Sequence, residues 1–489
     1  YDDAVTVSHE LELTLTGKNA GPEGRVPMCG IPYHAAETYI YRLVQKGYKV
    51  AICEQMEDPK KAKGLVKRDV IRIVTPGTIL FENSIADKSN NYLAYLYETD
   101  NDIDAVLADI STGECWWGIW DKKKEREAFF DMLSVYAPTE AVCSLSDNFY
   151  GRLEAYCRAR LGGCLLTRRR EEGEYPVPHV AEALGDENIR RVFAWLAAYL
   201  KEMMKADAAE FHTVMPIREE DCLLLGEDCL RNLEITRNMR DGGRRGTLLE
   251  ILDHTHTAMG ARLLRRWLER PLTDVNRIIQ RQDGIEELTG HTTELSQLEE
   301  MLEHVFDFER ILTRIEANTT SPKDLLALKA SLGMIPEIKK LLFGTVSIVL
   351  RKLSDQMDIH STVYELLDRS MNENGTGNIR DGKYIKEGYS AELDEVRSLS
   401  ENSRKWIADL EEREKEKTGI KLKIGFNNVF GYYFEITNAN KVPIPEYYMR
   451  KQTLVNAERY ITPELKEFET KALSAKEKTE ELELKIYQA

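Results

Sequence analysis

The sequence contains no apolar run long enough to cross a membrane and no signal-like N-terminus, so we expect a cytoplasmic protein with no membrane partner. Its eight cysteines form no Cys-x-x-Cys pair and most lie in apolar surroundings, which predicts reduced, buried thiols and no metal centre. Basic residues are not in excess either, because 67 Lys and Arg are outnumbered by 83 Asp and Glu, for a net charge of −16. A protein coated in basic surface is therefore excluded, and any contact with nucleic acid must be local.

The phosphate-binding pattern GxxxxGK(S/T) is absent as well. Gly17-Lys18 has no glycine at the required upstream spacing and is followed by Asn19. We therefore expect no cofactor in this chain and no ATP hydrolysis by this chain alone.

Two groups of residues in the sequence resemble parts of a metal site, but neither group contains enough ligands. His254 and His256 stand two residues apart, but no Cys or second carboxylate pair lies at ligand spacing, which favours a capping or loop role. Asp109, on an expected strand, and Glu114, across a tight turn, do not provide the several converging carboxylates of a two-metal nuclease. The sequence thus predicts neither a catalytic residue nor a metal site.

At 489 residues the chain is long enough for three or four domains. The pattern of turn, helix and strand residues in 1–82 predicts a compact α/β unit, with a helix that stops at Gly47 and a strand that follows it. From 83 to 206 alternating strands mix with helices, which predicts a second α/β domain. From residue 207 onward apolar residues recur at the helical period, which predicts a helical bundle.

The segment 421–466 is the most informative about function. It begins as two alternating strands around Asn427-Asn428, a hairpin turn, and ends where Thr462-Pro463-Glu464 opens a new helix. Long charged helices over 391–419 and 466–488 flank the segment, which places it at the tip of a stalk. The loop between its ends mixes cations, amides and a phenol, groups that hold phosphate oxygens without reading bases: Arg450, Lys451, Gln452, Asn456, Arg459 and Tyr460.

Four blocks, in order, carry a resemblance to a known family: Gly30-Ile31-Pro32-Tyr33-His34 with Ala51-Ile52-Cys53-Glu54-Gln55; Arg72-Ile73-Val74-Thr75-Pro76-Gly77-Thr78; Asn232-Leu233-Glu234-Ile235 with Met259-Gly260 and Trp267-Leu268; and Gly425-Phe426-Asn427 through Asn456-Ala457-Glu458-Arg459-Tyr460. Over nearly its whole length the chain resembles the MutS family of DNA mismatch-recognition proteins. Four blocks at plausible spacing are far more specific than any single motif.

The resemblance implies a multidomain architecture, α/β at first and then mainly α. Its parts are a partial mismatch-recognition domain (1–82), a ribonuclease-H-like α/β connector (83–206), lever helices (207–403), a β-containing clamp at the tip of the lever (404–462) and a partial returning lever helix (463–489). It also implies double-stranded DNA with mismatches or small loops as ligand, a homodimer and a MutL-type repair partner for the full-length protein.

The chain departs from the family pattern at both ends. The family places a Phe-x-Glu motif just before the sequence that Tyr1-Asp2-Asp3-Ala4 resembles, and an ATPase domain that holds ATP and Mg²⁺ would begin beyond Ala489. Both ends of this sequence lie inside an expected element, so we expect the natural chain to be longer. We also expect this segment to bind duplex DNA weakly, with strong salt dependence and little mismatch preference.

Candidate DNA contacts lie in two places. In the clamp the resemblance favours phosphate contacts by Arg450, Lys451, Asn456 and Arg459, with Val455 excluded as apolar. The alternative is a solvated loop, because Glu446, Glu458 and Glu464 nearly balance the cations. Tyr448 and Tyr460 are expected to pack at the base of the tip.

In the first domain, Pro27 and Met28 are candidates for an apolar contact with a widened minor groove. The alternative is that Met28 fills the small core. A run of cations offers either a further backbone contact or a solvated loop: Lys60, Lys61, Lys63, Lys67 and Arg68.

The function predicted is mismatched-DNA binding in DNA repair. A helical scaffold that docks a protein, a nuclease built on the second α/β domain and a family paralogue without mismatch duty are the alternatives. The sequence leaves open the mismatch preference and the oligomeric state.

Overall fold

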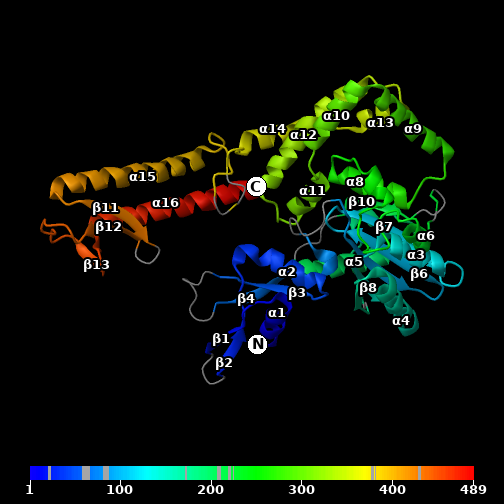
Figure 1. The fold of residues 1–489 in the computed structure, drawn as a ribbon, viewed down its shortest axis with the longest axis horizontal. Coiled ribbons are helices and arrows are strands. Elements are labelled where there is room, and N and C mark those ends of the chain that lie inside the picture. The colour runs from blue at the N-terminus through cyan, green and yellow to red at the C-terminus, as the bar shows by residue number, and fades with distance from the viewer. Residues whose placement is uncertain are drawn as a thin grey trace. The chain divides into compact units, whose positions relative to one another are not determined.

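A computed structural model of the chain describes residues 1–19, 24–57, 66–80, 88–170, 173–205, 211–217, 222–223, 225–375, 379, 382–427 and 431–489. The chain divides into two compact units (Figure 1). The first comprises Tyr1–Thr320 and Ala330–Ile359, and the second comprises Ser321–Lys329 and His360–Ala489. Every helix within the described ranges is too short or too polar to cross a membrane.

The N-terminal part of the first unit mixes helices with two small antiparallel sheets, β1-β2 and β3-β4. The elements are α1 (Asp2–Leu11), β1 (Thr16–Asn19), β2 (Arg25–Met28), α2 (Ala36–Gln45), β3 (Val50–Gln55) and β4 (Arg68–Val74). Gly47 follows α2 at φ 86°, a conformation that favours glycine, so the predicted helix stop is confirmed. The small core of this N-terminal part is built on Val44, Val74 and Ile79.

A six-stranded mixed sheet follows, with strand order β10-β7-β6-β5-β8-β9. Strands β7, β6 and β5 are antiparallel neighbours, whereas β8, β9 and β10 join in parallel. The mixed α/β prediction for this region is confirmed, and the sheet takes a further strand from beyond residue 206. Its strands are β5 (Tyr92–Glu98), β6 (Asp102–Asp109), β7 (Glu114–Asp121), β8 (Glu140–Ser144), β9 (Leu165–Arg168) and β10 (Thr213–Pro216).

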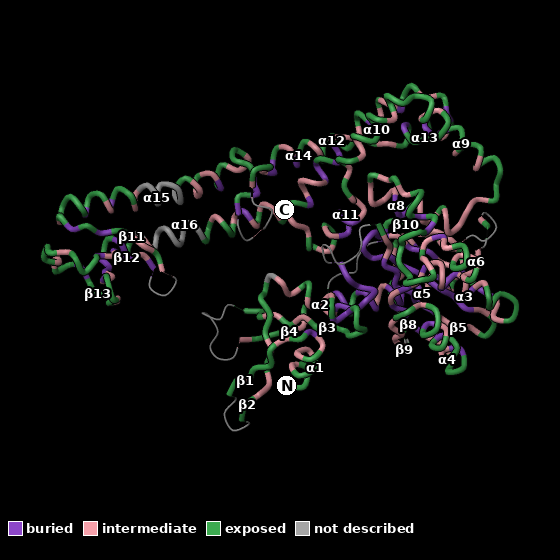
Figure 2. Tube along the Cα trace, viewed as in Figure 1, coloured by how far each residue is buried: buried purple, intermediate pink, exposed green. Residues whose placement is uncertain are grey.

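Helices cover both faces of this sheet: α3 (Arg126–Tyr136), α4 (Asp147–Tyr156) and α5 (Glu187–Met204). Alternate residues of β5 belong to different cores, because Leu93 and Tyr95 pack with Phe193 of α5, whereas Ala94 and Leu96 pack with Phe129 of α3. A strand buried on both faces reads as a continuous apolar run, which explains the segment YLAYLY. Figure 2 shows the resulting concentration of buried residues over these strands.

The rest of the first unit is helical, as the apolar periodicity predicts. Its helices are α6 (Glu227–Asn232), α7 (Leu248–Leu252), α8 (Ala258–Glu269), α9 (Val275–Gly290), α10 (Thr292–Glu303), α11 (Phe308–Glu316), much of α12 (Pro322–Phe343) and α13 (Ile348–Gln356). Thr247, Thr257, Asp274 and Asp307 accept hydrogen bonds from backbone amides as N-caps.

The second unit contains α14 (Ser361–Ser370), the long helices α15 (Ala391–Thr418) and α16 (Pro463–Gln488), and a four-stranded antiparallel sheet. Leu393 and Leu410 of α15 are buried as expected, and the Leu399 side chain lies outside the described residues. Near the far end of α16 the buried Glu483 accepts hydrogen bonds from the amides of Lys383 and Ile385. It also accepts one from Arg397, which ties α16 to α15.

Candidate nucleic-acid interface

The predicted tip is a sheet rather than a hairpin followed by a loop. Its strands are β11 (Leu422–Asn427), β12 (Gly431–Thr437), β13 (Met449–Thr453) and β14 (Ala457–Ile461), in the order β11-β12-β14-β13. The pairing of Asn427 with Gly431 confirms the hairpin, although the turn residue Asn428 lies outside the described residues. The loop prediction was wrong for the candidates on β13 and β14, because cross-strand pairing incorporates both segments, and only Asn456 lies in the turn between them.

The ends of the long helices fix this sheet in place. Helix α15 stops at Gly419, which adopts φ 69°, a left-handed conformation that glycine tolerates. Helix α16 starts with Pro463 at its first turn, and the side chain of Thr462 accepts a hydrogen bond from the amide of Leu465. The predicted helix start is therefore confirmed.

One face of the sheet forms the apolar base of the tip. Phe434, Tyr448 and Tyr460 are buried there with Leu410 and Leu465 of the two helices. The packing role predicted for both tyrosines is confirmed. The hydroxyl of Tyr448 donates to the buried carboxylate of Glu414 at 2.8 Å, and burial together with that carboxylate raises the pKa of Tyr448.

The opposite face holds a polar ladder that includes Arg459. Its guanidinium donates to Glu435 and to Gln452, each at 3.0 Å, and lies 4.3 Å from the ring centre of Tyr433. Gly425 makes room for that ring, because a Cβ at this position would approach it to 2.7 Å. Only 18% of the Arg459 side chain is exposed, so its charge is largely paired with groups of the protein itself.

The other clamp candidates are more accessible. Arg450 pairs with Glu458 at 3.0 Å while 62% of its side chain stays exposed. Hydrogen bonds from Tyr460 and Arg450 lower the pKa of Glu458. Lys451 sits at a register shift of β13 and is exposed. Asn456 is exposed in the turn beside Val455, whose exposed fraction is 92%. The structure places all four candidates on one hairpin, β13–β14. Arg450, Lys451 and Asn456 are exposed there to a ligand, whereas Arg459 is mostly buried.

The two candidates of the N-terminal region lie on β2. Pro27 accepts a hydrogen bond from the N-terminal amine, and Met28 pairs with Thr16 of β1. Met28 is 47% exposed and is not among the residues of the local core, so the structure offers no support for the core-filling alternative. Of the cationic run, Lys60, Lys61 and Lys63 lie outside the described residues.

Asp109 and Glu114, the two residues considered for nuclease chemistry, are both engaged by other residues of the protein. The buried carboxylate of Asp109 accepts four hydrogen bonds, from Asn90, from the Asn91 amide and from the amide and hydroxyl of Ser111. Glu114 pairs with Arg266 at 2.7 Å. Within the described ranges no group of three His, Cys, Asp or Glu is arranged to hold a metal.

The cysteine prediction was only partly right. All eight are free thiols, but only Cys115, Cys143 and Cys157 are buried, and Cys53 is exposed. Apolar neighbours in sequence do not ensure burial, since alternate residues of the edge strand β3 face outward.

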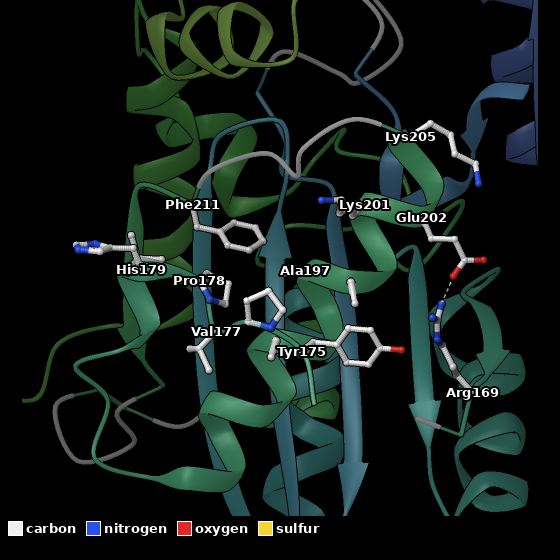
Figure 3. Close-up of a pocket in the computed structure, with 14 residues that line it drawn as sticks. Arg169, Tyr175, Val177, Pro178, His179, Ala197, Lys201, Glu202, Lys205 and Phe211 are labelled. Atoms are coloured by element: carbon white, nitrogen blue, oxygen red, sulfur yellow. Dashed lines mark hydrogen bonds and ion pairs between the residues drawn. The ribbon is translucent and has the colours of Figure 1, made fainter. Parts of the chain in front are cut away.

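A cavity of about 1040 Å³ opens beside α5, away from every predicted site residue (Figure 3). Tyr175, Pro178 and Phe211 give it an apolar wall, and the ion pair of Arg169 with Glu202 borders it at 2.8 Å. It holds no group that the DNA-binding hypothesis uses.

The arginines of α8 are a further group that the sequence marks only as part of a helical pattern. Arg262, Arg265 and Arg266 surround a small cavity with Arg237 and Arg270. The repeated basic residues of RLLRRWLER were the available signal, but the partners that distinguish these arginines come from distant segments.

Comparison with known proteins agrees with the sequence resemblance. Models of MutS domain I and MutS domain III match residues 1–83 and 228–486. The DNA mismatch repair protein MutS of Caldanaerobacter subterraneus subsp. tengcongensis is 40% identical over 502 aligned residues, which cover all of this chain and 57% of that protein. MutS of Listeria monocytogenes serovar 1/2a is 41% identical over 494 residues, with 100% and 56% covered.

MutS of Clostridium botulinum strain Kyoto is 41% identical over 498 residues, with 100% and 53% covered. The chain thus spans somewhat more than half the length of these relatives. The domain III match alone covers more than half of the chain, and the matched regions include the tip sheet and the region of Met28. On this basis the chain belongs to the MutS family.

Proposed function

We propose that this chain is the sensor and clamp part of a mismatch-repair protein that, at full length, binds double-stranded DNA at mismatches or small unpaired loops, and that the chain by itself binds duplex DNA weakly with little mismatch preference. The observation that carries the proposal is the joint match to MutS domains I and III in one chain whose relatives are named DNA mismatch repair proteins. A mispaired site stacks poorly, so bending the duplex there costs less than at matched DNA. A protein that kinks DNA converts this difference into specificity without reading bases.

The clamp contacts in this proposal are sequence-independent. Arg450, Lys451 and Asn456 are exposed on one hairpin and would hold backbone phosphates. Arg459 remains a candidate, but a phosphate contact would require it to release Glu435 or Gln452. Its first role is then to brace the strand that carries the other contacts.

In the N-terminal region, Met28 and Pro27 are the candidates to lean on a widened minor groove. The exposed position of Met28 at the end of β2 supports that role. An apolar side chain there would stabilise a bent duplex by contact with sugars and base edges.

The finer architecture is part of the same proposal. We assign a mismatch domain to 1–82, a ribonuclease-H-like connector to 83–206, lever helices to 207–403, a clamp to 404–462 and a returning helix to 463–489. The lever would carry the DNA-bound state to an ATPase domain that holds ATP and Mg²⁺ outside this chain. A homodimer, a MutL-type partner and a cytoplasmic location belong to this proposal for the full-length protein.

A salt titration on matched and mismatched duplexes tests the clamp. Arg450→Ala combined with Lys451→Ala should weaken binding equally on both duplexes and reduce the slope of log K against log salt by about 2. Arg351→Ala with Lys352→Ala, two exposed cations of α13, is the control with the same change of charge.

Equal affinity and slope in the clamp and control variants would remove the phosphate contacts from the proposal. Binding of a repair protein without any binding of DNA would favour the scaffold alternative. Duplex binding without any preference for a mismatch, in a full-length protein, would favour a paralogue.

A further inference from the structure

A small arginine-lined cavity lies in the first unit, where the six-stranded sheet meets α8. Its volume is about 190 Å³, and we call it the arginine pocket. The sheet side contributes Tyr92 of β5, the end of α3 and the segment that follows it. The helical side contributes the carboxylate of Glu269 and five guanidinium groups: Arg237, Arg262, Arg265, Arg266 and Arg270. The wall therefore comes from two regions that are distant in sequence.

Three of the five arginines are held by carboxylates. Arg262 makes two hydrogen bonds to Asp307, at 2.7 and 2.8 Å, and one to Glu309. Arg266 pairs with Glu114 at 2.7 Å, and Arg265 pairs with Glu269 at 2.9 Å. These pairs fix the wall and neutralise much of its charge.

The remaining two, Arg237 and Arg270, are different. Within the described part of the chain, neither has a carboxylate at ion-pair distance. Arg270 instead donates to the hydroxyl of Tyr136 at 2.9 Å. Loss of contact with water and the nearby Arg265 lower the pKa of Arg237, and the carboxylate of Glu269 offsets this only in part.

We propose that the arginine pocket binds a phosphate group, with Arg237 and Arg270 as its charged contacts. Guanidinium groups match the oxygens of phosphate with paired, charge-assisted hydrogen bonds. The volume exceeds the ~30 Å³ that one water occupies in the liquid but falls short of the ~300 Å³ where ordinary small-molecule pockets begin. A single phosphate group fits this range, whereas a whole nucleotide does not.

A phosphate held here would bridge the sheet and α8. Arg266 would keep its own contacts, which are the ion pair with Glu114 and the ring of Trp116, whose centre lies 4.9 Å from the guanidinium. The phosphate could be free or part of a nucleic-acid backbone, and the chemistry of the contact is the same. The inference does not depend on the clamp contacts proposed above.

Calorimetric titration of the full chain with inorganic phosphate, at constant ionic strength set by chloride, tests the site. Loss of Arg237 leaves the three paired arginines in place, so Arg237→Gln should fold while binding phosphate at least about tenfold more weakly. Arg240→Gln, an exposed arginine three residues away, is the matched control and should bind as the unaltered chain does. Arg270→Lys keeps the charge but loses the guanidinium, so a smaller loss is expected.

The proposal is overturned if phosphate binds no better than chloride, or if Arg237→Gln and Arg240→Gln bind it equally. A competition arm identifies the source of the phosphate. Inorganic phosphate that displaces a duplex from the unaltered chain, but not from Arg237→Gln, indicates a DNA backbone. Saturable phosphate binding without displacement indicates a free anion, and either result leaves the clamp test to be judged separately.

Discussion

The six-stranded sheet of the first unit and the four-stranded sheet at the tip treat charged side chains in opposite ways. The first has helices on both faces and buries Asp104, Asp109 and Glu140 almost completely. The second has an apolar core on one face and keeps its charges, such as Arg450 and Glu435, on accessible positions. A charge in the first sheet must be satisfied internally, whereas a charge in the second can exchange its partner for water or a ligand.

Glu140 shows how strict that requirement is. Its two oxygens accept hydrogen bonds from the hydroxyls of Thr75, Thr167 and Tyr199 and from the amide of Gly77, and Lys49 lies 3.6 Å away. One buried carboxylate on β8 thus joins the N-terminal region to β9 and α5. In the tip sheet the ion pairs of Arg450 with Glu458 and of Arg459 with Glu435 each keep one partner more than a third exposed, so we expect a weaker dependence on a single group.

The largest expected effect is therefore at Glu140. Glu140→Ala should cost about 3–5 kcal/mol, because it leaves several buried donors without their carboxylate acceptor and removes the opposite charge beside Lys49. Hydrogen exchange of the amides in 75–78 and β8 would measure the loss locally, which suits a chain of several domains. Glu140→Gln, which keeps one acceptor oxygen, should lose less. Unchanged protection in Glu140→Ala would refute the contrast between the two sheets.

Asp104 should show the cost of a buried charge without partners. Burial, with Asp186 and Asp102 nearby, raises the pKa of Asp104 to about 7, and its Oδ2 has no hydrogen-bond partner among the described residues. The unfolded chain releases this proton near pH 4, so the folded state binds more protons between about pH 4 and 7. Stability should therefore fall as the pH rises through that window.

Asp104→Asn removes this titration and should stabilise the sheet by roughly 1–3 kcal/mol at pH 8, with little gain at pH 4. Thermal unfolding across pH 4–8 would measure it. Asp109→Asn is the contrasting control, since loss of a carboxylate with four hydrogen bonds should destabilise at pH 8. A pH profile for Asp104→Asn that matches the unaltered chain would contradict the account.

The smallest effects are expected at the tip. Arg450→Ala should change stability by less than about 1 kcal/mol, because its pair with Glu458 is solvent-exposed. Arg459→Ala should cost more, about 1–2 kcal/mol, since two hydrogen bonds and the contact with Tyr433 are lost. Hydrogen exchange of β12 and β14 would compare the two. Equal losses would mean that Arg459 does not brace the sheet.

Local pattern predicted most of the fold. The strands in the region of β5 to β7, the stop at Gly47 and the Thr462-Pro463 helix start each follow from the chemistry of a few neighbouring residues, and the structure confirms them. The strands β13 and β14 were missed because polar residues dominate them. Their pairing depends on β12, which lies more than ten residues away along the chain.

The sequence by itself determined the family and the order of a mixed α/β region followed by a largely helical one, and it predicted the stretch in which clamp contacts should be sought. Only tertiary structure decided which charges are available there. Arg450 and Arg459 look alike in sequence, yet Arg459 is neutralised by Glu435, a residue of another strand. The same holds for the arginine pocket, because Arg237 and Arg266 differ only through partners brought from distant segments. Cross-strand and interhelical distances set the electrostatics of a site, and no local pattern encodes them.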